Sequence, residues 1–272
     1  MHQPRIVVFF DVLGFRALAE KHELPYLVRA FQVFYGSVLS AGVRLQTRKS
    51  LRQGELDTGD FILKDGGDVS TEAPGDVVRA LQQATGWDIF LLSDSLVMYS
   101  PEVHGSEVEE RLVEAVLLSR VAAMRFFESR LPIRGAIAYG ELHADRDAQI
   151  YCGSGLIEAY ETAESQDWLG VTVAPSAEGL VDARVVQFDA DHPHDGIRPG
   201  WDILRWDVPF KSGARSAWTV NWASAWNYGG HVRDDFFEAR MTGDPSVDGK
   251  YERTLEFLQT WYGRWIADKN AS

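Results

Sequence analysis

Two aspartates stand directly after apolar runs that have the composition of buried strands. Asp11 follows the run Ile6–Phe10 and precedes a turn that carries Gly14. Asp94 lies between two serines that join two further apolar segments. A carboxylate at the end of a core strand needs a counter-charge, which a neighbouring cation or a metal ion supplies. Two such carboxylates predict a divalent-metal site and, with it, phosphate chemistry.

The composition limits the domain organisation and the partners. With 272 residues, 45 % of them apolar, the chain can bury a sizeable core. We expect a single domain over residues 1–272, with a polar insertion at about 46–76 and a tryptophan-rich C-terminal extension at about 200–272. The net charge of −13 comes with no basic stripe, which argues against nucleic acid as a partner.

The same composition predicts a cytoplasmic protein. The single cysteine, Cys152, excludes an intrachain disulfide framework and a multi-cysteine metal site, so a reducing compartment is expected. The segment Met1–Arg5 leads into the first strand without the pattern of a signal peptide. No apolar run approaches the roughly 20 residues that span a bilayer, so no membrane span is expected.

Apolar periodicity predicts the elements that would position the two aspartates. Helical spacing predicts helices at 15–18, 24–45, 77–84, 107–130, 155–165, 175–181 and 247–267. Strands are predicted at 6–10, 132–140 and 169–173, and a hairpin at 87–99 that bends at Ser93-Asp94-Ser95. This order fits a ferredoxin-like α+β fold, a mainly antiparallel sheet flanked by helices, here expected on one face.

The C-terminal third gives weaker signals. Residues 182–213 are rich in Asp, Pro and Gly and are predicted to be irregular. Trp218, Trp222 and Trp226 have the i, i+4, i+8 spacing of a helix face, and we interpret them as a packing stripe rather than a base-stacking platform.

The motifs and their order resemble the class III nucleotide cyclases. The resemblance covers roughly residues 5–20 and 87–185 and is carried by the segments 9–15, 93–95, 134–141 and 167–173. The variant that the chain resembles is the bacterial pyrimidine cyclase of anti-phage Pycsar systems, which converts UTP or CTP to a 3′,5′-cyclic nucleotide. The resemblance implies a ferredoxin-like cyclase core and a homodimer in which both subunits contribute to each active site.

The resemblance also implies roles for individual residues. Asp11, Asp94 and the carbonyl of Val12 would hold two Mn²⁺ or Mg²⁺ ions per site. The turn after the first strand would cradle the β- and γ-phosphates with free N–H groups, because it opens a helix. The predicted nucleotide-binding residues are Phe10, Val12, Leu13, Gly14, Phe15, Asp88, Arg134 and Asp167.

Simpler interpretations remain open for three of these residues. Asp88 and Asp167 occupy positions where purine cyclases read the base, but each is nearly as well explained as a surface aspartate. Arg134 is as well explained by pairing with a carboxylate at the edge of the core as by a contact with phosphate.

Two positions depart from the pattern of the purine cyclases. Those enzymes carry an Asn and, four residues later, an Arg, whereas this chain has Ala174 and Glu178. The departure argues against a standard adenylate or guanylate cyclase. Another basic residue would have to stabilise the leaving phosphate, and Arg134, Arg184 and Lys211 are the candidates.

We therefore predict a uridylate cyclase, a phosphorus–oxygen lyase that makes cyclic UMP and pyrophosphate from UTP. The product would be a second messenger in antiviral defence, read by a separate effector protein. The alternatives are a cytidylate cyclase and a catalytically inactive, nucleotide-binding dimerisation module. A haloacid-dehalogenase-like phosphatase is set aside, because Leu13 stands where that chemistry needs a second aspartate.

Overall fold

The computed structural model describes residues 3–15, 20, 86–128, 131–186, 197–224 and 245–271. The helices predicted at 24–45 and 77–84 and the polar insertion at 46–76 lie outside these residues, as does all but the first residue of the helix predicted at 15–18.

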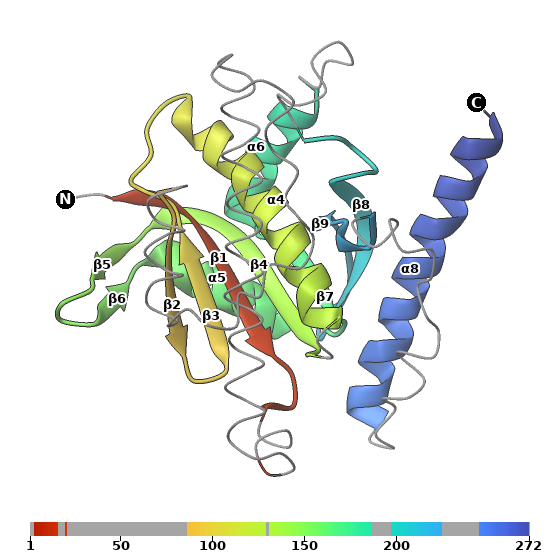
Figure 1. The fold of residues 1–272 in the computed structure, drawn as a ribbon, viewed down its shortest axis with the longest axis horizontal. Coiled ribbons are helices and arrows are strands. Elements are labelled where there is room, and N and C mark those ends of the chain that lie inside the picture. Colours follow the sequence, from red (N-terminus) through yellow and green to blue (C-terminus); the bar gives the residue numbers. More distant parts are fainter. Residues whose placement is uncertain are drawn as a thin grey trace, which may run out of the picture.

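Seven strands of the described chain form one sheet, in the order β2-β3-β1-β4-β7-β9-β8 (Figure 1). Their bounds are β1 Pro4–Val12, β2 Asp88–Leu92, β3 Ser95–Tyr99, β4 Ile133–Glu141, β7 Gly170–Val173, β8 Ile203–Phe210 and β9 Gly213–Val220. Neighbouring strands are antiparallel except for β4 and β7, which are parallel. The predicted α+β class with a mainly antiparallel sheet is confirmed.

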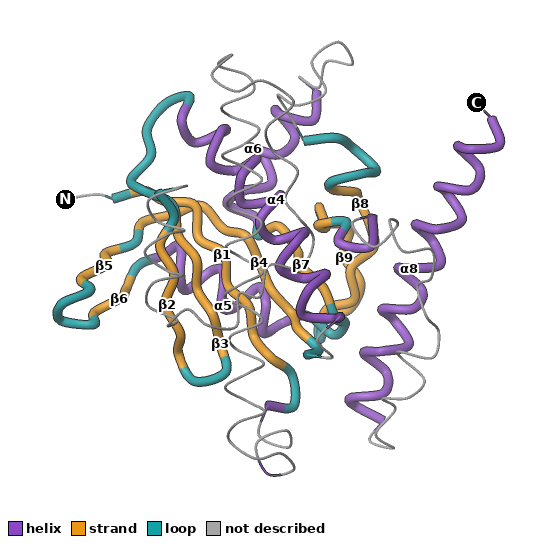
Figure 2. The backbone as a smooth tube through the Cα atoms, viewed as in Figure 1, coloured by secondary structure: helices purple, strands orange, loops and turns teal. Residues whose placement is uncertain are grey.

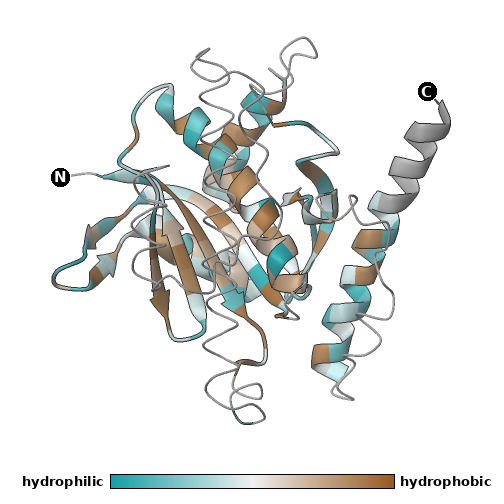
Figure 3. Cartoon of the chain, in the orientation of Figure 1, coloured by the Kyte–Doolittle hydropathy of each residue, from teal (hydrophilic) through white to brown (hydrophobic). Residues whose placement is uncertain are grey.

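Helices cover both faces of this sheet, whereas the sequence analysis expected them on one face. Helix α4 (Glu107–Glu128) lies in front of the sheet in Figure 1, and α5 (Ser154–Ser165) lies behind it. Successive residues of β1 alternate between the two sides, so that Val8 and Phe10 join the cluster with α4 while Val7 and Phe9 pack with α5. The strand is apolar at consecutive positions because both faces are buried (Figure 3).

Most of the predicted core elements are present at the expected places. The hairpin β2–β3, helix α4, strand β4, helix α5 and strand β7 follow one another as predicted. Helix α6 (Pro175–Val186) extends further than predicted, and β8 lies in the segment that was expected to be irregular. Both corrections concern a stretch where Asp and Pro obscured the pattern of apolar residues.

The predicted tryptophan helix is wrong over its described residues. Trp218 belongs to strand β9 and Trp222 follows that strand, while Trp226 lies outside the described residues. Both described tryptophans are nevertheless buried in the main core, so the prediction that they pack is confirmed. A spacing of four residues puts two side chains on the same side of a strand as well as of a helix, and it therefore did not distinguish the two.

The C-terminal helix α8 (Pro245–Ala271) lies beside the edge of the sheet that β8 and β9 form (Figure 2). Its Phe257 contacts Trp168 and Trp206, with ring centroids 5.1 Å apart in both pairs. A small second sheet is formed by β5 (His143–Asp145) and β6 (Ile150–Cys152). None of the helices in the described residues combines the length and the apolar character that a membrane crossing requires.

Candidate active site

The candidate site lies at one end of the sheet, on the face that α5 covers. Asp11 pairs in register with Ser95 of β3 on one side and with Arg134 of β4 on the other. Residues opposite one another in neighbouring strands point to the same face, so these three side chains form a row across the sheet. The Ser95 hydroxyl donates to Asp11 Oδ1 at 3.4 Å.

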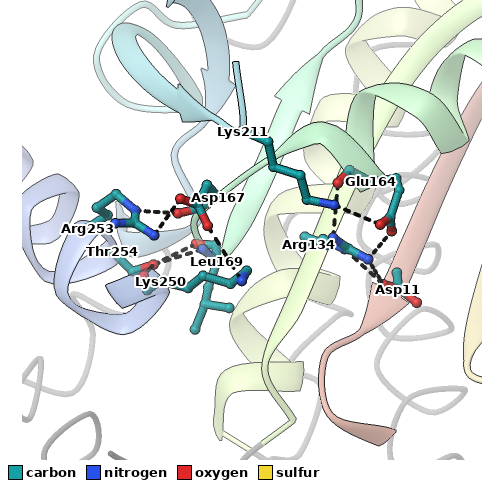
Figure 4. Close-up of polar contacts among 9 residues, drawn as sticks. All are labelled: Asp11, Arg134, Glu164, Asp167, Leu169, Lys211, Lys250, Arg253 and Thr254. Atoms are coloured by element: carbon teal, nitrogen blue, oxygen red, sulfur yellow. Dashed lines mark hydrogen bonds and ion pairs between the residues drawn. The ribbon is translucent and has the colours of Figure 1, made fainter. Parts of the chain in front are cut away.

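Arg134, at one end of this row, connects Asp11 to Glu164 of α5 (Figure 4). Its Nε donates to Asp11 Oδ2 at 2.8 Å, and its Nη2 is also 2.8 Å from that oxygen. Nη2 further pairs with the carboxylate of Glu164. Nη1 donates to the Glu164 carbonyl oxygen at 3.1 Å. Arg134 thus pairs with a carboxylate at the edge of the core, the simpler of the two interpretations that its sequence position allowed.

The last turn of α5 supplies the other side of the network. The final carbonyl groups of a helix have no partner within it, and here Arg134 and Lys211 supply donors. The backbone N–H of Lys211 donates to the Ser165 carbonyl at 2.8 Å, and its Nζ donates to Glu164 Oε1 at 2.8 Å. Two of the three basic residues considered for phosphate contacts therefore meet at one carboxylate. The third, Arg184, pairs with Glu109 of α4 at 3.3 Å.

Asp94 lies at the bend between β2 and β3, beside Asp11. Its carbonyl accepts the Val12 N–H at 3.2 Å, and its carboxylate makes no hydrogen bond or ion pair to any described residue. Burial raises the pKa of Asp11 above its usual range against the opposing charge of Arg134, and the charges of Asp94 and Glu164 raise it further. Because the charges of Asp11 and Asp94 repel each other, binding of a cation next to both carboxylates would be favourable.

The donor set fits a metal ion that is shared with a phosphate ligand. No group of three or more His, Cys, Asp or Glu side chains suited to a metal ion occurs among the described residues. Mg²⁺ that acts on nucleotides is commonly held by one or two carboxylates, with substrate phosphates and water completing the shell. Asp94, Asp11 and the Val12 carbonyl would suffice for such a site, and their assignment as ligands stays a prediction.

The turn after β1 has fewer free amides than the sequence analysis expected. The N–H groups of Val12 and Leu13 donate to the carbonyls of Asp94 and Pro132, at 3.2 and 2.8 Å, so neither is free for a phosphate. The side chains of Phe10 and Val12 are buried in the core. Gly14, at φ 69°, is exposed and has open space where a side chain would be. A phosphate cradle here would have to begin at Gly14 and Phe15.

The two predicted base-reading aspartates lie at opposite ends of the sheet. Asp88 begins β2, pairs in register with Tyr99, and forms an ion pair with Arg146. Tyr99 is four residues from Ser95 on β3, so Asp88 lies about 13 Å along the strand direction from the row that contains Ser95 and Asp11. Asp167 precedes β7 at the same end as Asp11.

Asp167 is held by helix α8 (Figure 4). Its Oδ2 lies 2.6 Å from Arg253 Nη2, and its Oδ1 lies 3.5 Å from Lys250 Nζ. Its carbonyl oxygen accepts a further hydrogen bond from Arg253 Nε at 2.5 Å. Both base-reading assignments stay predictions, and within one chain neither aspartate joins the network around Asp11.

The two positions that depart from the purine cyclases lie at the far end of β7. Ala174 is completely buried and its carbonyl accepts the first bonds of α6. Glu178, one turn into α6, is paired with Arg205 and Arg215 at 3.6 and 3.9 Å. Neither can provide the amide or guanidinium contacts that the purine enzymes have at these positions.

Sequence reasoning missed Glu164. At the end of an amphipathic helix, this residue resembles a solvated surface charge. Two signals could have identified it: Arg134 in an apolar strand requires a carboxylate, and the small residues Ala136, Ala138 and Gly140 on the same face leave room for a helix. An added Cβ at Gly140 would lie 2.7 Å from the amide nitrogen of Gly155, so α5 does approach closely there.

Comparison with known proteins returns nucleotide cyclases among solved structures. No protein-family model matches the sequence, and no curated protein matches it. The adenylyl cyclase CyaB from P. aeruginosa aligns over 81 % of this chain and 94 % of its own, with 12 % identity and a TM-score of 0.40. A guanylyl cyclase aligns over 81 % and 92 %, with 9 % identity and a TM-score of 0.41.

A third structure, an adenylate cyclase from Trypanosoma brucei in its monomeric state, aligns over 81 % and 90 %, with 11 % identity and a TM-score of 0.35. At these levels of identity and superposition, the similarities assign no activity to this chain.

Proposed function

We propose that this chain is a nucleotide cyclase that converts UTP to 3′,5′-cyclic UMP and pyrophosphate. The observation that carries the proposal is the pair Asp11 and Asp94, two adjacent carboxylates at the ends of neighbouring core strands, beside the cations Arg134 and Lys211. A site with two carboxylates for metal ions and two cations for phosphates has the charges that a metal–triphosphate complex requires.

The reaction forms one bond and breaks one. The ribose 3′ oxygen attacks the α-phosphorus and loses its proton, and the bond from that phosphorus to the β-phosphate oxygen breaks, which releases pyrophosphate. Divalent ions held by Asp11 and Asp94 would make the hydroxyl more acidic and neutralise phosphate charge. Arg134 and Lys211 would hold the pyrophosphate portion, where negative charge accumulates as the bond breaks.

The pyrimidine preference, the antiviral role, the cytoplasmic location and a separate effector for the product rest on the sequence resemblance. The environments of Ala174 and Glu178 support the departure from a purine cyclase. A buried methyl group and a carboxylate paired with two arginines replace the purine-cyclase clamp, so ribose and phosphate must be held differently here. Cytidine triphosphate is the alternative substrate.

A second candidate function is a catalytically inactive module that binds nucleotides and dimerises. The ion pair between Arg134 and Asp11 favours it, because this guanidinium supplies the counter-charge that a metal ion would otherwise provide. The cyclase would convert a nucleotide to a cyclic product, whereas the inactive module would bind the nucleotide without converting it.

Incubation of the protein with Mn²⁺ and all four nucleoside triphosphates at equal concentration, followed by mass spectrometry of the products, tests the proposal. Predominant cyclic UMP is the expected result. Predominant cyclic AMP or cyclic GMP would contradict the pyrimidine assignment, and predominant cyclic CMP would contradict only the choice of uridine. Nucleotide binding without any cyclic product would favour the inactive module.

A further inference from the structure

Glu164 bridges two cations in the way that a phosphate group would. Its Oε2 pairs with Arg134 Nη2, and its Oε1 accepts from Lys211 Nζ at 2.8 Å (Figure 4). One oxygen for each cation is the arrangement in which a phosphate could replace the carboxylate with little movement of the cations.

The three members of this bridge differ in how firmly they are held. The Arg134 side chain is 10 % exposed, and the Glu164 carbonyl holds its Nη1 independently of the carboxylate. The Glu164 side chain is 41 % exposed, and the described residues that its carboxylate contacts are these two cations. The Lys211 side chain is 52 % exposed, and its Nζ contacts Glu164. Arg134 is therefore the fixed member of the bridge, and the Glu164 carboxylate can leave it while Lys211 turns toward a bound ligand.

In the absence of a ligand, the charges around Glu164 favour its ion pairs with Arg134 and Lys211. Burial would by itself raise the pKa of Glu164, but the hydrogen bond from Lys211 and the charges of Arg134, Lys211 and Lys250 outweigh burial and lower it. An ionised carboxylate next to these cations competes directly with any other anion for them.

We propose that Glu164 is a positioning residue that takes the place of a substrate phosphate between Arg134 and Lys211 and leaves this place when a polyphosphate binds. The inference rests on the proposed function, because a triphosphate substrate is the ligand that would use both cations. It assigns to Glu164 two effects: it keeps the cations aligned in the empty site, and it lowers the affinity of the site for phosphates.

The test measures binding of inorganic triphosphate by isothermal titration calorimetry, in chelator without metal ions and again with Mn²⁺. For Glu164→Gln we expect binding about tenfold tighter than in the wild type without metal ions, because one charge-assisted contact no longer has to be broken. Glu164→Ala, which removes the acceptor completely, should tighten binding at least as much. Circular dichroism verifies that both variants are folded.

Glu161→Gln is the matched control. Glu161 is exposed on the same helix, one turn before Glu164, and its substitution removes the same charge without touching either cation. We expect its affinity to equal that of the wild type. Tightening in Glu161→Gln equal to that in Glu164→Gln would reduce the effect to net charge and overturn the proposal.

Unchanged or weaker binding in folded Glu164→Gln and Glu164→Ala would also overturn it, as would the absence of triphosphate binding in all four proteins. The metal-free measurement separates this inference from the proposed function. Tighter binding in the variants supports the phosphate-like role even if no cyclic nucleotide is made, whereas cyclase activity with unchanged affinity in the variants overturns the role of Glu164 alone.

Discussion

At the scale of single residues, Asp11 and Asp94 differ in what else their carboxylates do. Asp11 is held by Arg134 and Ser95, so its substitution disturbs a structural ion pair as well as any metal site. The Asp94 carboxylate has no hydrogen-bond or ion-pair partner among the described residues, so its substitution isolates the metal role.

The first prediction follows from this difference. Asp94→Asn should lower cyclase turnover by about a hundredfold or more, because a neutral ligand no longer balances the metal charge, while the melting temperature stays that of the wild type. Steady-state kinetics over a series of Mn²⁺ concentrations measure the turnover, and thermal denaturation measures the melting temperature.

The matched control for this prediction is Asp207→Asn, an exposed aspartate on strand β8. It removes the same charge at the edge of the sheet opposite to the β2–β3 hairpin, and we expect normal turnover. A folded Asp94→Asn protein with near-normal activity would refute the assignment of Asp94 as a metal ligand.

Much of the candidate site could be predicted from the sequence at the scale of single residues. Asp11, Asp94 and Arg134 could be singled out because a charged residue in an apolar run needs a partner, and the structure brings all three to one end of the sheet. Glu164 and the position of Lys211 could not be obtained in this way, since each depends on the packing of a distant element. The pattern of neighbouring residues does not show that the end of α5 meets the turn between β8 and β9.

At the scale of elements, one buried hydroxyl adds a hydrogen bond to the aromatic and ionic contacts that attach α8 to the core. Thr254 is completely buried, and its Oγ1 accepts the backbone N–H of Leu169 at 2.8 Å while donating to the Lys250 carbonyl at 2.8 Å. The bond fastens the helix to the residues that precede β7, next to Asp167.

The second prediction concerns this bond. Thr254→Val keeps the shape but leaves the Leu169 N–H without an acceptor, so the free energy of unfolding should fall by roughly 1–3 kcal/mol in urea denaturation. Thr260→Val is the control, because Thr260 makes the same intrahelical bond at 2.8 Å but is exposed. Equal losses in the two variants would show that the bond to Leu169 adds nothing.

Elements with a strong and uninterrupted pattern were predicted well, and those without one were not. Helix α4 has a continuous apolar stripe, and the β2–β3 hairpin has two apolar runs around a short polar bend. Strand β9 instead begins with an exposed half, and its Trp218 and the following Trp222 matched a helical spacing by coincidence. The second covered face of the sheet was missed because α5 packs through alanine and glycine, which contribute little to an apolar pattern.

At the scale of the whole molecule, one chain keeps its predicted site residues apart. Asp11 and Asp94 lie at one end of the sheet, and Asp88 lies at the other. If Asp88 contributes to the same reaction, a second copy of the chain must bring it, as the predicted homodimer with shared active sites would.

The third prediction tests this arrangement by subunit mixing. Asp11→Asn and Asp88→Asn homodimers should each be nearly inactive, while a mixture refolded together should regain about a quarter of wild-type activity, since half of its dimers carry one intact site. Light scattering should give the mass of a dimer. An active monomer, or a mixture no more active than its components, would refute the composite site.

The position of β1 in the sheet has a consequence for the synthesis of the chain. Among the strands of this sheet β1 is synthesised first, but it lies between β3 and β4, and the second of these ends at Glu141. At roughly 5–20 residues per second, its apolar run waits roughly 6 to 26 s for the partners that cover its edges. Unpaired apolar strands are the segments through which nascent chains aggregate. This buried strand can pair with β3 once Tyr99 is made, but its second edge stays open until Glu141 is made. Expression yield should therefore depend on translation rate and chaperone supply as well as on equilibrium stability.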